Sequence, residues 1–156
     1  MIKEKDNYNF GKLVDLLGAK KQRKIPIVSK NTTLDEIIDA FARSAHSRLI
    51  YVVDDAKKIA GVISLGDLIR HVFFHYHEQH QYIDKTQLIK MATCETANDF
   101  MKKEPLVATT SDNIEDVLEK MIKYNAKEIP VVDNEKRIVA DLTMVDFLKY
   151  CKSEVL

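Results

Sequence analysis

One sequence pattern occurs twice in the chain, and this repeat constrains the fold more than any other feature. Residues 59–69 read IAGVISLGDLI, and residues 138–148 read IVADLTMVDFL. In each copy a short apolar run ends at a hydroxyl residue, and an aspartate follows three positions later. An apolar strand that runs directly into a helix, present twice in 156 residues, indicates an internal structural repeat.

The residues around the pattern extend the repeat. Each copy is preceded by a segment with apolar residues at helical spacing and then by an apolar strand. The helical segments begin at Thr32 and Asp112, and the strands are residues 49–53 and 129–133. A unit of about 55 residues buries too little surface to be stable alone. We therefore expect an α+β fold of two tandem β-α-β-β-α motifs, packed sheet to sheet with pseudo-twofold symmetry.

The expected organisation is a single module over residues 1–156. Motif one covers about residues 12–80, a linker about 81–96, and motif two about 97–152. The linker has helical character over 86–91, and we expect it to cover a sheet or to extend a dimer interface. A proline at position 26 predicts that the first short strand lies at a sheet edge, because proline cannot donate to a ladder.

Composition narrows the function classes. The chain has 24 basic and 24 acidic residues, so it lacks the positive excess typical of nucleic-acid binders. Two distant cysteines, Cys94 and Cys151, are expected to be reduced thiols. No apolar run is long enough to span a membrane, and the N-terminus lacks a signal-peptide core. These features predict a cytoplasmic protein without membrane insertion, although docking onto a membrane protein stays open.

The repeated pieces resemble a pair of cystathionine β-synthase (CBS) domains. The resemblance lies in the ordered set of Ile129–Asp133, the Thr143-x-x-Asp146 junction, their echoes at Ile50–Asp54 and Ser64-x-x-Asp67, and Phe100-Met101. Such pairs commonly bind adenine nucleotides in two clefts, often form homodimers, and regulate an attached or partner protein. The resemblance thus implies a non-catalytic regulatory module whose ligand is AMP, ADP, ATP or a related adenosyl compound, with no other cofactor.

The resemblance also implies which residues contact the nucleotide. A carboxylate accepts hydrogen bonds from a ribose diol, a helix start suits a phosphate, and a cation just before the second strand neutralises its charge. The implied positions are Asp67 and Asp146 for the ribose, Ser64 and Thr143 near the phosphates, Arg48 and Lys127 as cations, Ser47 and Ala126 as neighbours, and Pro26 and Leu106 on the base side.

Two observations from the residues qualify this assignment. A hydroxyl followed by an acid three positions later is also an ordinary helix capping box. In addition, Asp141 shares a strand face with Thr143, so it would repel a phosphate in the second cleft unless a cation intervened. We therefore expect the first cleft, with Ser64, Asp67 and Arg48, to be the better phosphate site. The basic run 20–24 reads as a solvated loop or as a contribution to anion binding.

A histidine-rich helix offers another possible function. His71, His75 and Glu78 share one face of the helix that follows Ser64, a spacing with which side chains ligate zinc or a similar ion. A solvated face, a dimer contact or a pH-responsive contact fits the same residues. The alternatives to a nucleotide sensor are therefore a ligand-free dimerisation or interaction module, and a metal-responsive module. An enzyme is disfavoured, because no nucleophile–base grouping or glycine-rich phosphate loop is present.

Overall fold

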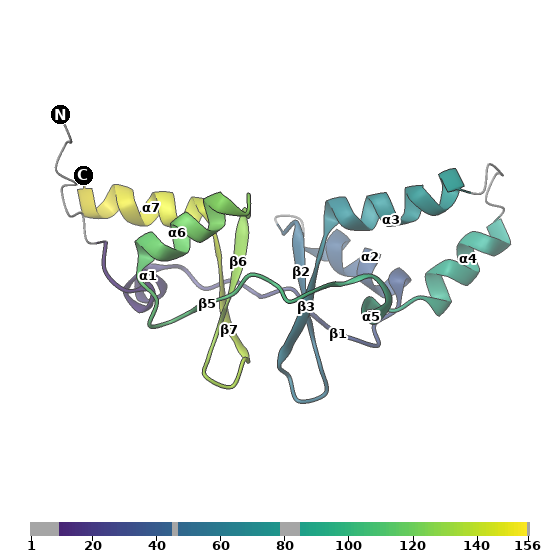
Figure 1. Cartoon of the computed structure of the whole chain (residues 1–156), viewed down its shortest axis with the longest axis horizontal. Coiled ribbons are helices and arrows are strands. Elements are labelled where there is room, and N and C mark those ends of the chain that lie inside the picture. The colour runs from purple at the N-terminus through teal and green to yellow at the C-terminus, as the bar shows by residue number, and fades with distance from the viewer. Residues whose placement is uncertain (1–9, 45–46, 79–84, 156) are drawn as a thin grey trace. The chain divides into compact units, whose positions relative to one another are not determined.

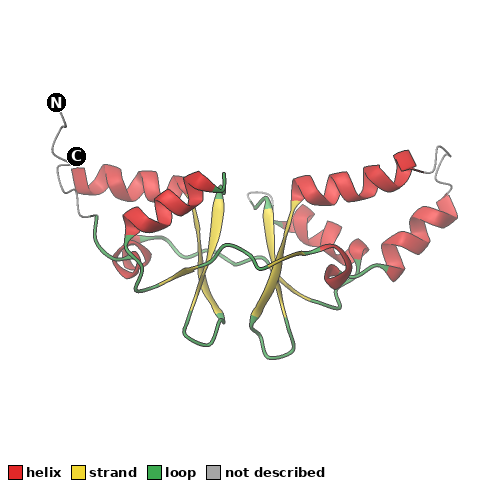
Figure 2. Cartoon of the chain, in the orientation of Figure 1, coloured by secondary structure: helices red, strands yellow, loops and turns green. Residues whose placement is uncertain are grey.

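The chain folds as two compact units, seen in a computed structural model that describes residues 10–44, 47–78 and 85–155. The central unit spans residues 24–105, and the terminal unit combines the chain up to Arg23 with residues 106 onward. Each unit has one sheet, shown with the element labels in Figure 1, and its helices lie on one side of that sheet (Figure 2). The protein is therefore a mixed α+β fold, as predicted.

The central unit contains the first copy of the repeat. Its sheet has the order β1-β2-β3-β4, in which β1 and β2 are parallel and the other neighbours are antiparallel. Its strands are β1 (Ile27–Ser29), β2 (Leu49–Val53), β3 (Ile59–Ser64) and β4 (Lys102–Lys103). Its helices are α2 (Leu34–Arg43), α3 (Leu65–Glu78), α4 (Lys85–Cys94) and α5 (Ala97–Phe100). The first strand lies at the sheet edge, which confirms the prediction from Pro26.

The terminal unit contains the second copy. Its sheet has the order β5-β6-β7, again with a parallel first pair and an antiparallel second pair. Its strands are β5 (Ala108–Thr109), β6 (Glu128–Val132) and β7 (Ile138–Thr143). Its helices are α1 (Leu13–Ala19), α6 (Ile114–Lys123) and α7 (Met144–Val155).

The hairpins of the two copies match closely. The Asp54 carboxylate accepts the amides of Ala56 and Lys58 at 2.9 and 3.0 Å, and the Asp133 carboxylate accepts those of the corresponding turn at 2.8 and 3.0 Å. Both turns place a lysine in the left-handed region, Lys57 at φ 64° and Lys136 at φ 62°. The strand pairing of each hairpin also shifts at the same relative position. The repeat is therefore structural as well as sequential.

The helices that follow the short first strands form where the apolar spacing predicts them. In α2, Thr33 and Glu36 make a reciprocal capping box, with bonds of 3.0 and 3.3 Å. The buried face of α2 packs on β2 and β3 in the core of the central unit. Ile114, Val117 and Met121 of α6 do the same in the terminal unit. Each unit thus has its own hydrophobic core.

Helix α1 comes before the first β-α-β-β-α segment in the sequence, but it packs in the terminal unit with the second such segment. Leu13 and Leu16 of α1 are fully buried in the terminal core, beside residues of α6, β6 and α7. The amide of Leu13 donates to the carbonyl of Asp112 at 2.8 Å. Conversely, α5 precedes the second copy but belongs to the central core, where the amide of Ala97 donates to Thr32 at 2.9 Å. Each copy therefore receives its first helix from the segment before the other copy.

Candidate functional site

The strand–helix junction of each copy brings a hydroxyl and an aspartate together at a helix start. Ser64 ends β3 and its Oγ accepts the backbone amide of Asp67 at 3.0 Å. Thr143 ends β7 and its Oγ1 accepts the backbone amide of Asp146 at 3.2 Å. Each hydroxyl caps the helix that follows, α3 or α7, because it accepts a hydrogen bond from an amide of the first helical turn.

The cations predicted beside the junctions lie next to them in both copies. The carbonyl of Arg48 accepts the first amide of α3, Leu65 N, at 2.9 Å, and the carbonyl of Lys127 accepts the first amide of α7, Met144 N, at 3.0 Å. Both side chains are exposed. Backbone pairing across the hairpin therefore holds one basic residue at each junction.

The Asp67 carboxylate is accessible and surrounded by positive charge. Its side chain is 46% exposed and pairs with Arg70, one turn further along α3. Burial alone would raise the pKa of Asp67, but hydrogen bonds from Ser64 and Arg70 and the charges of Arg70 and Lys102 hold it below its ordinary value. Lys102 lies in β4, opposite Val62 of β3. This carboxylate is thus ionised at neutral pH and open to a ligand.

The Asp146 carboxylate is engaged within the protein. It accepts the amide of Thr143 at 2.9 Å, which completes a capping box, and it lies 3.9 Å from Lys20 and 3.5 Å from Arg23. Its side chain is 16% exposed. The capping interpretation of this motif therefore describes the second junction, where the carboxylate already has a backbone donor and two cations.

Asp141 lies two residues before Thr143 and is buried, with 1% of its side chain exposed. Its Oδ1 accepts Arg23 Nε at 3.2 Å, whereas its Oδ2 has no hydrogen-bond partner among the described residues. Burial would lower the pKa of Arg23, but the bond to Asp141 and the charges of Asp141, Asp146 and Glu128 raise it above its ordinary value. Arg23 is therefore a cation that lies directly beside Asp141.

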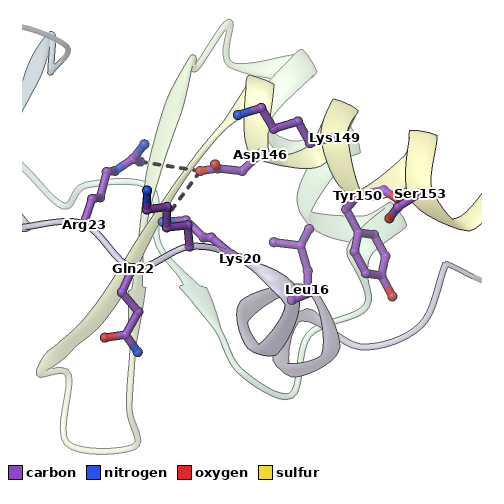
Figure 3. A pocket seen from close by; sticks show the side chains of 10 residues that line it. Leu16, Lys20, Gln22, Arg23, Asp146, Lys149, Tyr150 and Ser153 are labelled. Carbon is purple, nitrogen blue, oxygen red and sulfur yellow. Dashed lines mark hydrogen bonds and ion pairs between the residues drawn. The ribbon is translucent and has the colours of Figure 1, made fainter.

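A pocket of about 560 Å³ lies beside Asp146 in the terminal unit (Figure 3). Its wall is formed by one side of α7 and by the segment from α1 to Arg23. Figure 3 shows Lys20 and Arg23 directed at the Asp146 carboxylate, with Lys149 on the same side of the helix. The lining residues are Leu16, Ala19, Lys20, Lys21, Gln22, Arg23, Asp146, Lys149, Tyr150 and Ser153.

The remaining predicted contact residues divide evenly between the units. Pro26 and Ser47 are partly buried in the central unit, where the Pro26 carbonyl accepts Tyr51 N at 3.0 Å and Ser47 Oγ donates to Leu49 O at 3.4 Å. Leu106 and Ala126 pack against the terminal core. Several residues at the junctions were not predicted as contacts, namely Lys20, Arg23, Arg70 and Lys102. Two of these residues, Lys20 and Arg23, lie in the basic run 20–24, for which the sequence allows a contribution to anion binding.

The described part of the histidine helix has a structural role. His71 Nε2 lies 2.6 Å from Glu95 Oε2, and its ring stacks on Phe100 at a centroid distance of 5.0 Å. This contact joins α3 to the segment before α5. The side chains of His75 and Glu78 lie outside the described residues. Among the side chains that are described, no group of three or more histidine, cysteine, aspartate or glutamate residues is placed to hold a metal ion.

The chain belongs to the CBS domain family, whose sequence profile matches residues 21–73 and 97–153. Protein MJ1225 of Methanocaldococcus jannaschii, which is uncharacterised, is 24% identical over 155 residues, or 99% of this chain and 49% of that protein. The chain therefore spans about half the length of this relative. In the described residues, no helix is long and apolar enough to cross a membrane.

Solved CBS-domain structures share the fold. A CBS domain-containing protein of Thermotoga maritima has a TM-score of 0.70 and 26% identity, over 90% of this chain and 94% of that one. CBSX2 in complex with AMP has a TM-score of 0.70 and 21% identity, over 92% and 97%. The cytosolic domain of the Mg²⁺ channel MgtE in complex with ATP has a TM-score of 0.61 and 26% identity, over 80% and 44%.

Proposed function

We propose that this protein is a regulatory module that binds an adenine nucleotide at the Ser64–Asp67 junction of the central unit. The observation that carries this proposal is the Asp67 carboxylate, which is half-exposed, ionised and flanked by Arg70 and Lys102 at the start of α3. A carboxylate in this state accepts both hydroxyls of a ribose. The first turn of α3 and the nearby cations then suit a phosphate.

Two solved relatives of the fold support the choice of ligand. Both AMP and ATP, found in complexes of CBSX2 and MgtE, consist of adenosine with a different number of phosphates. The shared adenosine matches a site built around a ribose-binding carboxylate. CBS domain proteins are generally regulatory and non-catalytic, and the proposal keeps this role: the module responds to the nucleotide and passes the signal to a partner protein as a homodimer.

The contact residues in this proposal are those that the family resemblance implies. Asp67 binds the ribose, Ser64 and Arg48 lie near the phosphate, and Pro26 and Ser47 complete the first set. The corresponding set in the terminal unit is Leu106, Ala126, Lys127, Thr143 and Asp146. Because the Asp146 carboxylate already has a backbone donor and two cations, the first set is the stronger site.

Isothermal titration of the full chain with AMP and with ATP tests the proposal. We expect saturable binding by the unmodified protein and a loss of roughly tenfold or more in affinity for Asp67→Ala, since hydrogen bonds to a charged group contribute about 1.5–3 kcal/mol. The Ser64 cap uses the backbone amide of residue 67, so this variant keeps the start of α3. Asp146→Ala should have the smaller effect.

Asp39→Asn is the matched control, because it removes an exposed carboxylate from α2 of the same unit. Its affinity for AMP should equal that of the unmodified protein. Absence of both binding heat and thermal stabilisation with every adenine nucleotide would refute the sensor proposal. A ligand-free dimerisation or interaction module would then be the better description of the protein.

A further inference from the structure

The two copies of the repeat differ in charge at one equivalent strand position. Val62 and Asp141 each lie two residues before the junction hydroxyl. They also occupy the same place in their sheets, since Val62 pairs with Tyr51 of β2 and Asp141 pairs with Pro130 of β6. An apolar residue and an acidic residue therefore occupy the same place in the two repeated junctions.

The carboxylate of Asp141 is unusual for its surroundings. Charged side chains are rarely fully buried unless they are paired, and a buried carboxylate with an unsatisfied oxygen is costly. Asp141 is buried, and among the described residues Arg23 bonds to one of its two oxygens while the other has no partner. Replacing a buried ion pair with well-packed apolar residues is often neutral or stabilising, so an apolar residue such as Val62 would cost the fold less than Asp141 does. Packing therefore does not explain why an aspartate stands here, whereas a role in ligand selection does.

Arg23 is shared among the acids of the second junction. Its guanidinium bonds to Asp141 at 3.2 Å and lies 3.5 Å from Asp146, and Glu128 adds a third negative charge nearby. At the first junction, in contrast, the carboxylate of Asp67 is flanked by two cations, Arg70 and Lys102. Lys20 also lies 3.9 Å from Asp146, so among these groups two cations face three acids at the second junction, whereas two cations face one acid at the first.

We propose that Asp141 determines ligand specificity at the second junction. It lowers the affinity for nucleoside phosphates, so that this junction prefers nucleosides with an uncharged 5′ substituent. This inference rests on the proposed function, because it assumes that the junctions bind adenosine compounds. Asp141 acts by holding Arg23 and by adding its own negative charge close to Thr143. Lys21 and Lys149 also line the pocket, and water and salt screen their exposed charges as they do those of Arg70 and Lys102 at the first junction. The proposal therefore depends on Asp141, whose side chain is buried.

The size of the effect follows from Coulomb's law. Two residues along a strand span about 7 Å. Two unit charges at that distance, in an effective dielectric constant of about 20 to 80, change an affinity by roughly 3- to 50-fold. Removing the charge of Asp141 should therefore strengthen AMP binding at the second junction on the order of tenfold. Adenosine has no phosphate, so its affinity should stay the same.

The experiment measures the ratio of AMP affinity to adenosine affinity by titration of the full chain. Asp67→Ala serves as the background, because it weakens binding at the first junction and so increases the share of the signal that comes from the second. In this background Asp141→Asn should raise the ratio about tenfold, because asparagine keeps an acceptor for Arg23 and removes only the charge. Glu119→Gln, an exposed acid on α6 of the same unit, is the control and should leave the ratio unchanged.

The reciprocal variant tests the same idea at the first junction. Val62→Asp in the otherwise unmodified chain should lower the AMP affinity about tenfold more than the adenosine affinity. An unchanged ratio in Asp141→Asn, or no gain of AMP binding in that variant, would overturn the role of Asp141. If the unmodified protein bound neither AMP nor adenosine, and Asp141→Asn bound neither, the proposed function itself would have failed.

Discussion

At the scale of single residues, equivalent positions of the two copies hold different residues where different strands pack beside them. Gly61 in β3 corresponds to Ala140 in β7. A Cβ added at Gly61 would lie 2.7 Å from the carbonyl oxygen of Lys102 and 2.8 Å from the sulfur of Met101. The reason is that β4 pairs with β3 directly at this residue, whereas β7 is an edge strand of its described sheet. Glycine is needed in the first copy because the backbone of β4 approaches closely.

Gly61→Ala should therefore destabilise the protein by about 1–3 kcal/mol, since the new methyl group forces a shift of the β4 backbone. Chemical denaturation of the variant measures this directly. Gly18→Ala is the control, because a Cβ there meets nothing within 4 Å. This helical position should gain up to about 1 kcal/mol from the better helix former. Equal and small effects at both glycines would contradict the close approach of β4.

At the scale of elements, the two short helices that precede the copies are exchanged. The first helix, α1, contributes Leu13 and Leu16 to the core that contains β6, β7 and α7. The later helix, α5, contributes Ala97 to the core that contains β2 and β3. A contiguous piece of chain therefore does not correspond to a compact unit. A cut in the middle of the chain would leave each core without one of its helices.

Leu16→Ala should destabilise the terminal unit by about 2–5 kcal/mol, because it deletes a fully buried side chain. Hydrogen exchange locates the effect: amides in residues 106–155 should lose protection, although the substitution lies near the N-terminus. Ile37→Ala, at a fully buried position of α2, is the matched control and should act on residues 24–105. Loss of protection in the central unit from Leu16→Ala would refute the exchange.

At the scale of the whole molecule, the charge is balanced overall and unbalanced locally. The formal net charge is zero, yet the accessible carboxylate of Asp67 is flanked by two cations, while Asp141 and Asp146 share Arg23. Net charge alone therefore says nothing about where an anion binds. The distribution favours one junction over the other.

AMP at about 100 times its dissociation constant should stabilise the native protein by about 2.7 kcal/mol, if it binds only the folded state. Hydrogen exchange with and without AMP should show slower exchange at the start of α3, beside Ser64 and Asp67, than at the start of α7. Stronger protection beside Thr143 and Asp146 would place the nucleotide in the terminal unit and contradict the preference for the first junction. Hydrogen exchange of the Asp67→Ala variant in the presence of AMP is the reference for weakened binding at the first junction.

Local patterns made much of the fold predictable from the sequence. The capping box at Thr33, the apolar faces of α2 and α6, and the strand–helix junctions involve residues three or four positions apart, so sequence spacing reveals them. The repeat then doubled each signal, which identified the α+β class and the family. The hydroxyl–aspartate pairs of both junctions were found in this way, because each is a single helical turn.

Tertiary structure alone decided which charges surround those pairs. Arg23 and Asp141 are separated by 118 positions, and the bond between them depends on α1 packing in the unit of the second copy. The position of Lys102 near Asp67 likewise depends on β4 joining the sheet of the first copy. Spacing in the sequence predicts which residues are neighbours within one helical turn or across a hairpin, but not which distant segments pack together. The exchange of segments between copies depends on the path of the chain, and this path makes two similar junctions electrostatically different.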